Sequence, residues 1–371
     1  MKVIFVAGIE ENTPLQKTGI GRYASSLLAI FKSSKQFQFS LYTTKKRNRI
    51  LNTVQKIIGK DINNVLTTMP LYYPFKKFPK ESIIHLAAQT LAVPLALQKP
   101  RQPTIVTVHD IIPYACNEYH SVWEKLLYHF AMKGLKNATH IMTDSEHTKK
   151  DIIKLLGIPQ ERITVVYLGI DVDEFQDAGK NKKKIERQQN TILYVGSETR
   201  RKNLSILLKA VAEVKKQIPD VKLIKVGLPE DKKEHTKLQK LANKLQISEN
   251  ILWKGYVDNL AKEYRKATVF VLPSLYEGFG FPVLEAMTCG CPVICSSKTS
   301  LPELARDAGL YFDGYDYHQL AAQICLVLTN KGLQKKLRER GVKNVKSFTW
   351  QKCIKATEEV YSKYAKKNKK V

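Results

Sequence analysis

Acidic residues are scarce in this chain. Its 371 residues include 61 lysines and arginines against 34 aspartates and glutamates, which gives a formal net charge of +27. Such a charge predicts an anionic partner: a phosphate-rich ligand, an anionic membrane face or a nucleic acid. A solvated basic surface without any partner would explain it as well, so the charge alone does not choose.

Long apolar runs are missing too. No stretch reaches the roughly 18 clean apolar residues that a membrane-spanning helix needs. The first residues, MKVIFVAGIEE, hold an apolar run too short for a signal peptide and meet acidic residues at once. The six cysteines form no C-x-x-C pair and no spacing with histidines that is typical of zinc sites. We therefore expect a cytoplasmic protein without a membrane span, a disulfide framework or a bound metal.

The chain has the length and the pattern of two α/β domains. Apolar strand-like runs alternate with amphipathic helical patterns, and 43% hydrophobic residues are ordinary for a folded protein. Residues 177–190, DAGKNKKKIERQQN, are polar and charged, as a linker should be. We predict a first domain over 1–176, a linker over 177–190 and a second domain over 191–349, each with a parallel sheet.

One stretch, residues 271–303, has the pattern of a ligand site: VLPSLYEGFGFPVLEAMTCGCPVICSSKTSLPE. A buried strand leads into a glycine loop, where Gly278 and Gly280 let the backbone approach a ligand closely. A helix follows, with Pro282 at its start and Gly290 at its end. Its amino terminus would point free N–H groups at the loop, which suits a diphosphate.

Two carboxylates lie in this stretch, and carboxylates suit hydroxyl groups rather than phosphates. Glu277 falls in the loop and Glu285 falls eight positions later in the helix, so we expect them on either side of the phosphate position. Solvated surface acids would be the plainer interpretation. The E-x7-E spacing, with EGFGFP and LEAM around it, resembles the retaining glycosyltransferases of family 4, which have the GT-B fold.

The resemblance covers nearly the whole chain and implies two Rossmann-like domains that face each other across a cleft. It also implies that the last helix, about residues 350–366, crosses back to the first domain. In the family, the first glutamate contacts the donor sugar and the second contacts the nucleotide ribose, which assigns these roles to Glu277 and Glu285. The donor loop is completed by Gly278, Phe279, Gly280 and Phe281.

Two cations stand at the start of another helix, after the predicted strand TILYVG. Arg201 and Lys202 precede the amphipathic stretch NLSILLKAVAEVKKQI, where they would clamp an anion. A plain basic surface there would be unfavourable beside the positive end of the helix dipole. The resemblance implies that Lys202 holds the donor diphosphate. It also places an arginine directly after the strand's glycine, where this chain has Ser197, and Arg201 is the candidate for its replacement.

The first domain contributes a glycine loop. The segment TGIGRYA holds Gly19 and Gly21, but the following strand, QFSLYTTKK, lacks the ribose-binding acid of a dinucleotide site, so we exclude NAD. The resemblance implies instead that this loop closes over the donor phosphate and the acceptor.

His109 follows the predicted strand TIVTV, at the end where ligands gather in α/β sheets. A lone histidine often has only a structural role. The resemblance implies that this histidine contacts the donor sugar, so the expected catalytic residues are His109, Lys202 and Glu277.

The resemblance also implies that the loop after NILWKG lines the nucleotide base, a position that Tyr256 and Val257 occupy. Asp171 and Asp173 match the D-x-D spacing of metal-dependent transferases, but they end the first domain, far along the sequence from the donor loop. We expect the cations and the helix dipole to stabilise the diphosphate, with no metal or cofactor besides the nucleotide sugar.

Residues 45–80 are strongly basic, with nine lysines and arginines against Asp61 alone, a net charge of nine minus one, or +8. Apolar residues recur there at helical spacing: Ile50, Leu51, Val54, Ile57 and Ile58. The predicted amphipathic helix would either lie on anionic lipid or pack on the sheet. A later helix, HSVWEKLLYHFAMKGL, is expected to pack its apolar residues, Trp123 and Leu126 among them, in the core.

Together these features predict a retaining glycosyltransferase that moves a hexose. Mannose from GDP-mannose is the first candidate, and glucose or N-acetylglucosamine from a UDP-sugar is the next. The acceptor would be lipid-linked or a polysaccharide, at the cytoplasmic face of a membrane. A nucleotide-sugar 2-epimerase of the same architecture is the alternative enzyme, although the EGFGFP loop favours transfer. A nucleic-acid-binding protein would need aromatic residues interleaved with its basic ones on one face, a pattern that this charge distribution does not match.

Overall fold

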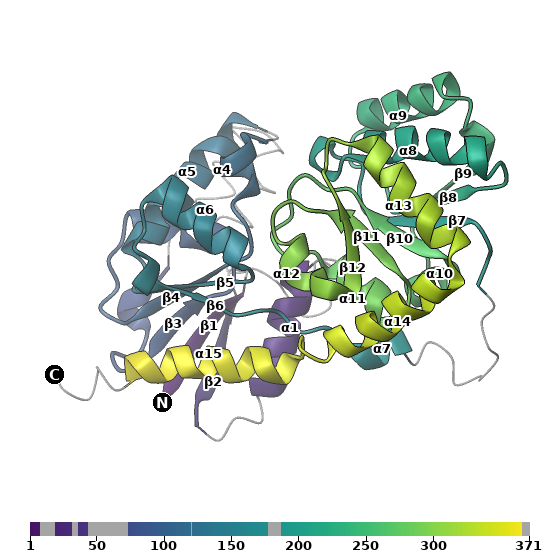
Figure 1. The fold of residues 1–371 in the computed structure, drawn as a ribbon. Helices are drawn as coiled ribbons and strands as arrows, with labels where there is room; N and C mark the ends of the chain where they lie inside the picture. The colour runs from purple at the N-terminus through teal and green to yellow at the C-terminus, as the bar shows by residue number, and fades with distance from the viewer. Residues whose placement is uncertain (8–18, 32–35, 44–72, 120, 177–186, 366–371) are drawn as a thin grey trace. The chain divides into compact units, whose positions relative to one another are not determined.

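The computed structural model of the protein describes residues 1–7, 19–31, 36–43, 73–119, 121–176 and 187–365. Its contacts divide the chain into two units, Met1–Gly169 with Trp350–Val371, and Ile170–Thr349. Each unit is a six-stranded parallel sheet covered by helices (Figure 1). The predicted pair of Rossmann-like α/β domains is confirmed.

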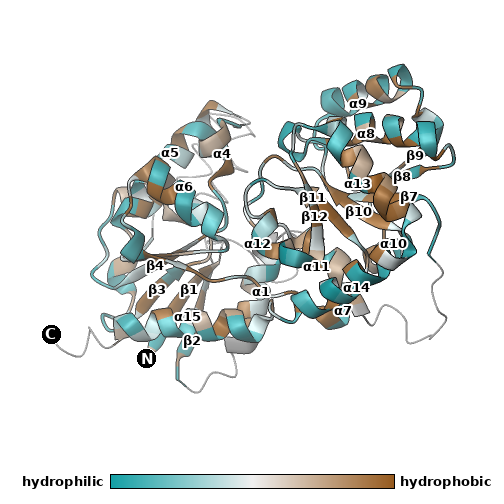
Figure 2. Cartoon of the chain, in the orientation of Figure 1, coloured by the Kyte–Doolittle hydropathy of each residue, from teal (hydrophilic) through white to brown (hydrophobic). Residues whose placement is uncertain are grey.

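The sheet of the first unit has the strand order β2-β1-β3-β4-β5-β6. Its strands are β1 (Lys2–Ala7), β2 (Gln38–Thr43), β3 (Ile83–Leu86), β4 (Thr104–Val108), β5 (His140–Thr143) and β6 (Ile163–Val165). Its α-helices are α1 (Gly19–Phe31), α4 (Ile112–Cys116), α5 (Val122–Asn137), α6 (Glu146–Leu156) and α15 (Trp350–Ala365), and its 3-10 helices are η2 (Phe75–Lys77), η3 (Gln89–Ala96) and η4 (Gln160–Arg162). Strands β1, β3 and β4 are mostly hydrophobic (Figure 2) and buried, as parallel strands covered on both faces should be, whereas the edge strand β2 includes the exposed Gln38 and Leu41.

Helix α1 starts earlier than the sequence indicates. Gly19 and Gly21, predicted to lie in a loop, form the first turn of this helix. Packing explains the difference, because Tyr23 and Leu27 are fully buried and the Tyr23 hydroxyl lies 2.7 Å from Thr107 Oγ1. Such tertiary contacts outweigh the low helix propensity of glycine.

Helix α5 does not bury all of its apolar residues. Leu127 and Leu135 are buried, whereas Trp123 is 45% exposed and Leu126 is 46% exposed. The expectation that these last two residues pack in the core is therefore wrong. Val122, at the start of the helix, is exposed as well, so the first turns of α5 carry an apolar outer face.

Helix α15 comes from the end of the chain and completes the first unit, as predicted for the returning helix. It lies along the sheet in Figure 1 (yellow). Two tyrosines one turn apart fix it there: the Tyr361 hydroxyl lies 2.6 Å from His85 Nδ1 on β3, and the Tyr364 hydroxyl lies 2.9 Å from His140 Nδ1 on β5. Both histidines are fully buried.

The second unit has the strand order β12-β11-β10-β7-β8-β9. Its strands are β7 (Thr191–Val195), β8 (Lys222–Val226), β9 (Ile251–Lys254), β10 (Val269–Leu272), β11 (Val293–Ser296) and β12 (Gly309–Phe312). Its α-helices are α7 (Val172–Gln176), α8 (Leu204–Gln217), α9 (Lys232–Lys244), α10 (Leu260–Lys266), α11 (Phe281–Thr288), α12 (Leu301–Ala305), α13 (Tyr317–Thr329) and α14 (Lys331–Val345), and its 3-10 helices are η5 (Arg200–Lys202), η6 (Ser248–Asn250) and η7 (Arg306–Ala308). From the sequence, residues 306–330, RDAGLYFDGYDYHQLAAQICLVLTN, are interpreted as a turn followed by a helix, whereas the structure has strand β12 in this segment before α13.

The boundary between the units also differs from the predicted one. Residues 170–176 belong to the second unit, because Phe175 on α7 is buried and packs against Tyr264 with ring centroids 6.4 Å apart. Gln188, in the predicted linker, donates its N–H to Lys266 O at 2.8 Å and so belongs to the second unit too. The rest of the predicted linker, residues 177–186, lies outside the described residues.

Most of the basic stretch falls outside the described residues, including its predicted amphipathic helix. The end of the chain, residues 366–371, lies outside them as well. In the part of the chain that the structure describes, no helix has the length and apolar character needed to cross a membrane.

The buried histidines under α15 are kept neutral. Burial, and then the charge of His109, lowers the pKa of His85 to about 3. Burial, followed by Lys363 and Arg162, lowers the pKa of His140 to about 4. Both groups therefore bind protons more readily in the unfolded chain, where a histidine titrates near 6.5.

We predict that the protein loses stability as the pH falls from 6 to 5, by up to about 1.4 kcal/mol per pH unit for each of these two histidines. The pKa of His109 is raised, so this histidine is largely protonated in both the folded and the unfolded chain over this range. It therefore contributes little to the change of stability with pH. Urea unfolding at both pH values measures the loss, and His140→Gln should show a smaller one. Equal stability of the parent protein at pH 6 and pH 5 would contradict the prediction.

Candidate donor site

The strand order of the second sheet reverses between β10 and β7. These strands are parallel neighbours, with Val269 opposite Ile192 and Phe270 opposite Leu193, although β8 and β9 lie between them in the sequence. In doubly wound sheets, ligands bind beyond the carboxyl ends of the strands at such a switch point. The loop after β7 carries Arg201 and Lys202, and the loop after β10 carries Glu277.

The two loops meet through an ion cluster. Lys202 Nζ donates to Glu277 Oε1 at 2.6 Å, and Arg201 Nη1 lies 3.7 Å from Glu277 Oε2. Ser274 also donates its hydroxyl to Glu277 Oε1, at 2.7 Å. Burial alone would raise the pKa of the Glu277 carboxyl, but Lys202 and Arg201 outweigh burial and hold that pKa below its ordinary value.

Backbone contacts hold the cluster in place. Leu275 donates its N–H to Arg201 O at 2.7 Å, and the Arg201 guanidinium donates to Tyr276 O at 3.3 Å. Asn203, which precedes α8, donates its side-chain amide to Pro273 O and to Gly314 O, at 3.2 and 2.8 Å. The segment that carries the two cations is therefore fixed to the loop after β10 by hydrogen bonds from neutral groups as well as from the Arg201 guanidinium.

The donor loop ends where the sequence indicates. Gly280 precedes α11 with a φ of 116°, a backbone conformation that residues with a Cβ rarely adopt, so any other residue would be strained there. Gly278 and Phe279 are buried within the loop, whereas Phe281, the first residue of α11, is half-buried. Gly290 follows the end of that helix with a φ of 62°, which is typical of a helix stop.

Glu285 does not join the ion cluster. It is buried in α11, and its Oε2 accepts a hydrogen bond from the Tyr264 hydroxyl at 2.9 Å. The sequence placed Glu277 and Glu285 on either side of the phosphate position; the structure binds the first to the cations and the second to a tyrosine of α10. The ribose contact of Glu285 stays a prediction.

Ser197 lies in the loop after β7. The Tyr194 hydroxyl donates to Ser197 O at 2.6 Å. Next in the chain, the buried carboxylate of Glu198 pairs with the buried Lys225 of β8 and lies 2.7 Å from His235 Nδ1. Ser197 thus contributes a backbone oxygen here, and the guanidinium nearest to Glu277 comes from Arg201.

The predicted base loop follows β9, at the edge of the sheet. Tyr256 is 65% exposed and Val257 is half-buried. Their role at the nucleotide base stays a prediction.

The remaining predicted residues belong to the first unit. His109 is buried; its Nδ1 lies 2.6 Å from Asp144 Oδ2 and its Nε2 lies 3.0 Å from Ala87 O. Burial lowers the pKa of His109, but Asp144 outweighs burial and the pKa is raised overall. Both ring nitrogens thus face oxygen acceptors within this unit, which suits an imidazolium. Gly19 and Gly21, in α1, belong to the same unit.

Several site residues escaped the sequence interpretation. The sequence patterns assign no role to Asn203, Ser274, Thr299 or Ser300, although the last two lie in the stretch 271–303. The signal was present, because TS directly before LPE resembles the hydroxyl-rich start of a helix. Within the described ranges, no group of three or more histidine, cysteine, aspartate or glutamate residues is arranged to hold a metal ion.

Known proteins match the chain over both units. The family of glycosyl transferases group 1 matches residues 175–344, and glycosyltransferase family 4 matches residues 61–174. O-antigen chain mannosyltransferase B of Escherichia coli is 33% identical over 273 residues, which are 69% of this chain and 69% of that protein. A D-inositol 3-phosphate glycosyltransferase of Streptomyces bingchenggensis is 28% identical over 240 residues, 61% of this chain and 53% of its own.

A solved structure extends the likeness to the fold. Anabaena HepE, crystallised with UDP and glucose, superimposes with a TM-score of 0.72 and 15% identity, over 98% of this chain and 100% of that one. The two parallel α/β units and the matches to known proteins indicate the same family. The chain belongs to the glycosyltransferases of group 1 and family 4, which have the GT-B fold.

Proposed function

We propose that the protein is a retaining hexosyltransferase that uses a nucleotide-sugar donor. The single observation that carries the proposal is the meeting of Lys202 and Arg201 with Glu277 at the switch point of the second sheet. Two fixed cations suit a diphosphate, and the carboxylate beside them suits sugar hydroxyls. Mannose from GDP-mannose is the first candidate for the donor, supported by the E. coli relative that is named a mannosyltransferase. Glucose or N-acetylglucosamine from a UDP-sugar comes next.

The proposed reaction runs on one face of the sugar. An acceptor hydroxyl attacks the anomeric carbon from the side on which the phosphate leaves, the bond to the phosphate oxygen breaks, and that oxygen takes the hydroxyl proton. Lys202, Arg201 and the first amides of α11 stabilise the negative charge of the nucleoside diphosphate as it leaves. Glu277 would orient the sugar, Glu285 the ribose, and Tyr256 and Val257 the base. The chemistry of these groups calls for no metal ion.

Glu277 is the counterion of Lys202 in the structure. A bound diphosphate would take over Lys202 and Arg201, because it carries more negative charge than one carboxylate. Glu277 would then be free to accept hydrogen bonds from the sugar. Donor binding is thus an exchange of counterions at one pair of cations.

The donor is identified by its effect on stability. We expect GDP-mannose to raise the unfolding temperature more than UDP-glucose or UDP-N-acetylglucosamine, since a ligand at about 100 times its Kd adds roughly 2.7 kcal/mol. Lys202→Ala should lose most of the shift with every donor. A larger shift with a UDP-sugar would replace the mannose assignment, and no shift with any donor would contradict the site. Release of an epimerised sugar without an acceptor would indicate the 2-epimerase instead.

The counterion exchange predicts opposite effects of Glu277→Gln on binding and on turnover. Affinity for free GDP or UDP should rise about tenfold, because the diphosphate no longer competes with the carboxylate, while transfer should fall by about 10²- to 10³-fold. Calorimetric titration and initial rates measure the two. Glu249→Gln, at an exposed position on η6, is the matched control and should change neither. Nucleotide affinity that stays the same or falls in Glu277→Gln would argue against the exchange.

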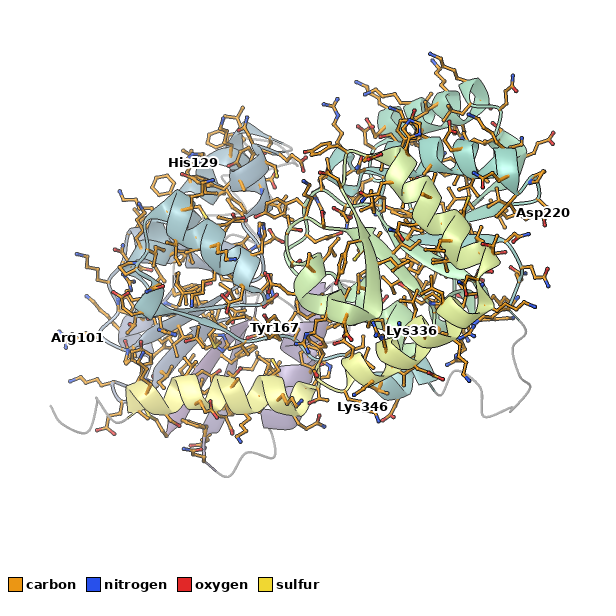
Figure 3. All side chains as sticks on the ribbon, in the orientation of Figure 1. Arg101, His129, Tyr167, Asp220, Lys336 and Lys346 are labelled. Atoms are coloured by element: carbon orange, nitrogen blue, oxygen red, sulfur yellow. The ribbon has the colours of Figure 1, made fainter. Side chains whose placement is uncertain are left out.

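We further propose that the protein works on a lipid-linked or polysaccharide acceptor at the anionic cytoplasmic face of a membrane. Besides the basic stretch, the described residues offer the outer face of α5, where Val122 is 83% exposed beside Trp123 and Leu126. Lys125 lies over the Tyr119 ring at 5.7 Å, which adds a cation and an aromatic ring to this face. His129, labelled in Figure 3, lies on the same helix and is exposed. Apolar, aromatic and cationic groups together suit a lipid surface.

The α5 face can be tested with vesicles. Trp123→Ser combined with Leu126→Ser should lower cosedimentation with anionic vesicles severalfold, because both side chains are half-exposed and would insert among the lipids. Leu155→Ser, at a comparably exposed leucine of α6, is the control and should leave binding unchanged. Equal cosedimentation of the double variant and the parent would exclude α5 as the contact. Binding to nucleic acid instead of vesicles would exclude the membrane partner.

A further inference from the structure

Thr299, in the loop between β11 and α12, has an unusual backbone. Its φ of 56° lies in the left-handed region. Among the described non-glycine residues with positive φ, it is the only β-branched one, the others being asparagine, glutamine and arginine. A β-branched side chain is poorly suited to this conformation, so the backbone here is strained. Such strain persists where surrounding contacts impose it, and it is common at functional sites.

The contacts of this loop converge on one residue of the donor loop. The Glu277 N–H donates to Thr299 Oγ1 at 3.1 Å. The neighbouring Ser300 hydroxyl donates to Phe279 O at 2.5 Å and has Glu277 O within reach at 3.1 Å. Two consecutive hydroxyls therefore engage the backbone on both sides of the Glu277 α-carbon.

The left-handed turn makes this double contact possible. In an extended chain, consecutive side chains point to opposite sides. With Thr299 in the left-handed region, its hydroxyl and that of Ser300 reach the same loop. Leu301, the next residue, contacts that loop as well, since its Cδ2 would lie 2.9 Å from a Cβ at Gly280.

We infer that Thr299 is a positioning residue of the donor site, held in a strained conformation so that its hydroxyl fixes the peptide N–H of Glu277. The Glu277 carboxylate is thereby kept at the distance that lets it serve first as counterion of Lys202 and then as acceptor for the sugar. The inference rests on the proposed function, and it adds Thr299 and Ser300 to the residues that determine the orientation of the donor sugar.

Three substitutions separate the hydrogen bond from the strain. Ser and Ala at position 299 differ by the hydroxyl, so Thr299→Ser should keep the parental kcat, whereas Thr299→Ala should lower it about 10- to 100-fold, the scale expected for a slightly misplaced reacting group. The donor KM and the Kd for the free nucleoside diphosphate should change less than about twofold, because the cations stay in place.

Ala and Gly differ in their tolerance of positive φ, so Thr299→Gly should unfold at a higher temperature than Thr299→Ala, the reverse of the usual order, without regaining kcat.

Each outcome decides a different point. Equal kcat for Thr299→Ala and Thr299→Ser, or a loss of nucleotide affinity parallel to the loss of kcat in Thr299→Ala, would overturn the positioning role. A Gly variant less stable than the Ala variant would overturn the strain. The unfolding temperatures need no donor, so a parent protein that turns over no nucleotide sugar while keeping the expected Ala and Gly order would refute the proposed function and leave the strain confirmed.

Discussion

The ion pair between Lys202 and Glu277 is the contact on which the site depends. It joins loops that are 75 residues apart in sequence. An ion pair shielded from water is stable only when its remaining hydrogen-bonding capacity is also satisfied. Here Ser274 supplies a hydroxyl to the carboxylate, and Arg201 supplies a second charge. The same pairing keeps Glu277 ionised, and it keeps two cations together at a place where an anion of higher charge can take them over.

The position of that pair is set by contacts that carry no charge. Neighbouring parallel strands bring the loops together, and the backbone bond from Leu275 to Arg201 closes the gap between them. Asn203 ties the same corner to the loop after β12, and Thr299 holds Glu277 from the other side. This division follows from the nature of the forces, because backbone hydrogen bonds are directional and fix geometry whereas charge attraction is not. Replacing a charge should therefore alter binding more than shape.

Local patterns explain what could be predicted from the sequence. Glycine and proline signals around α11 are read from neighbouring residues, and Gly280 and Gly290 lie where those signals indicated. The hydrogen bond from Tyr264 to Glu285 joins different helices and leaves no such trace. The exposure of Trp123 was missed because an apolar helical stripe looks the same whether it faces a core or a surface. Strand β12 was missed because GLYF is a short run that starts with a glycine and is followed by Asp313 and Gly314, residues that are typical of turns.

Buried carboxylates lie near the carboxyl ends of strands in both sheets. Four are buried among the described residues: Asp144, Glu198, Glu277 and Glu285. Burying a carboxylate is costly, so each needs a partner, and the partners are a histidine, a lysine, a lysine with an arginine, and a tyrosine. The first three follow directly or closely after β5, β7 and β10, at the ends of strands where ligands bind in this class of fold. In a chain so poor in acids, three of the four buried ones thus lie near the carboxyl ends of strands, each beside a basic partner.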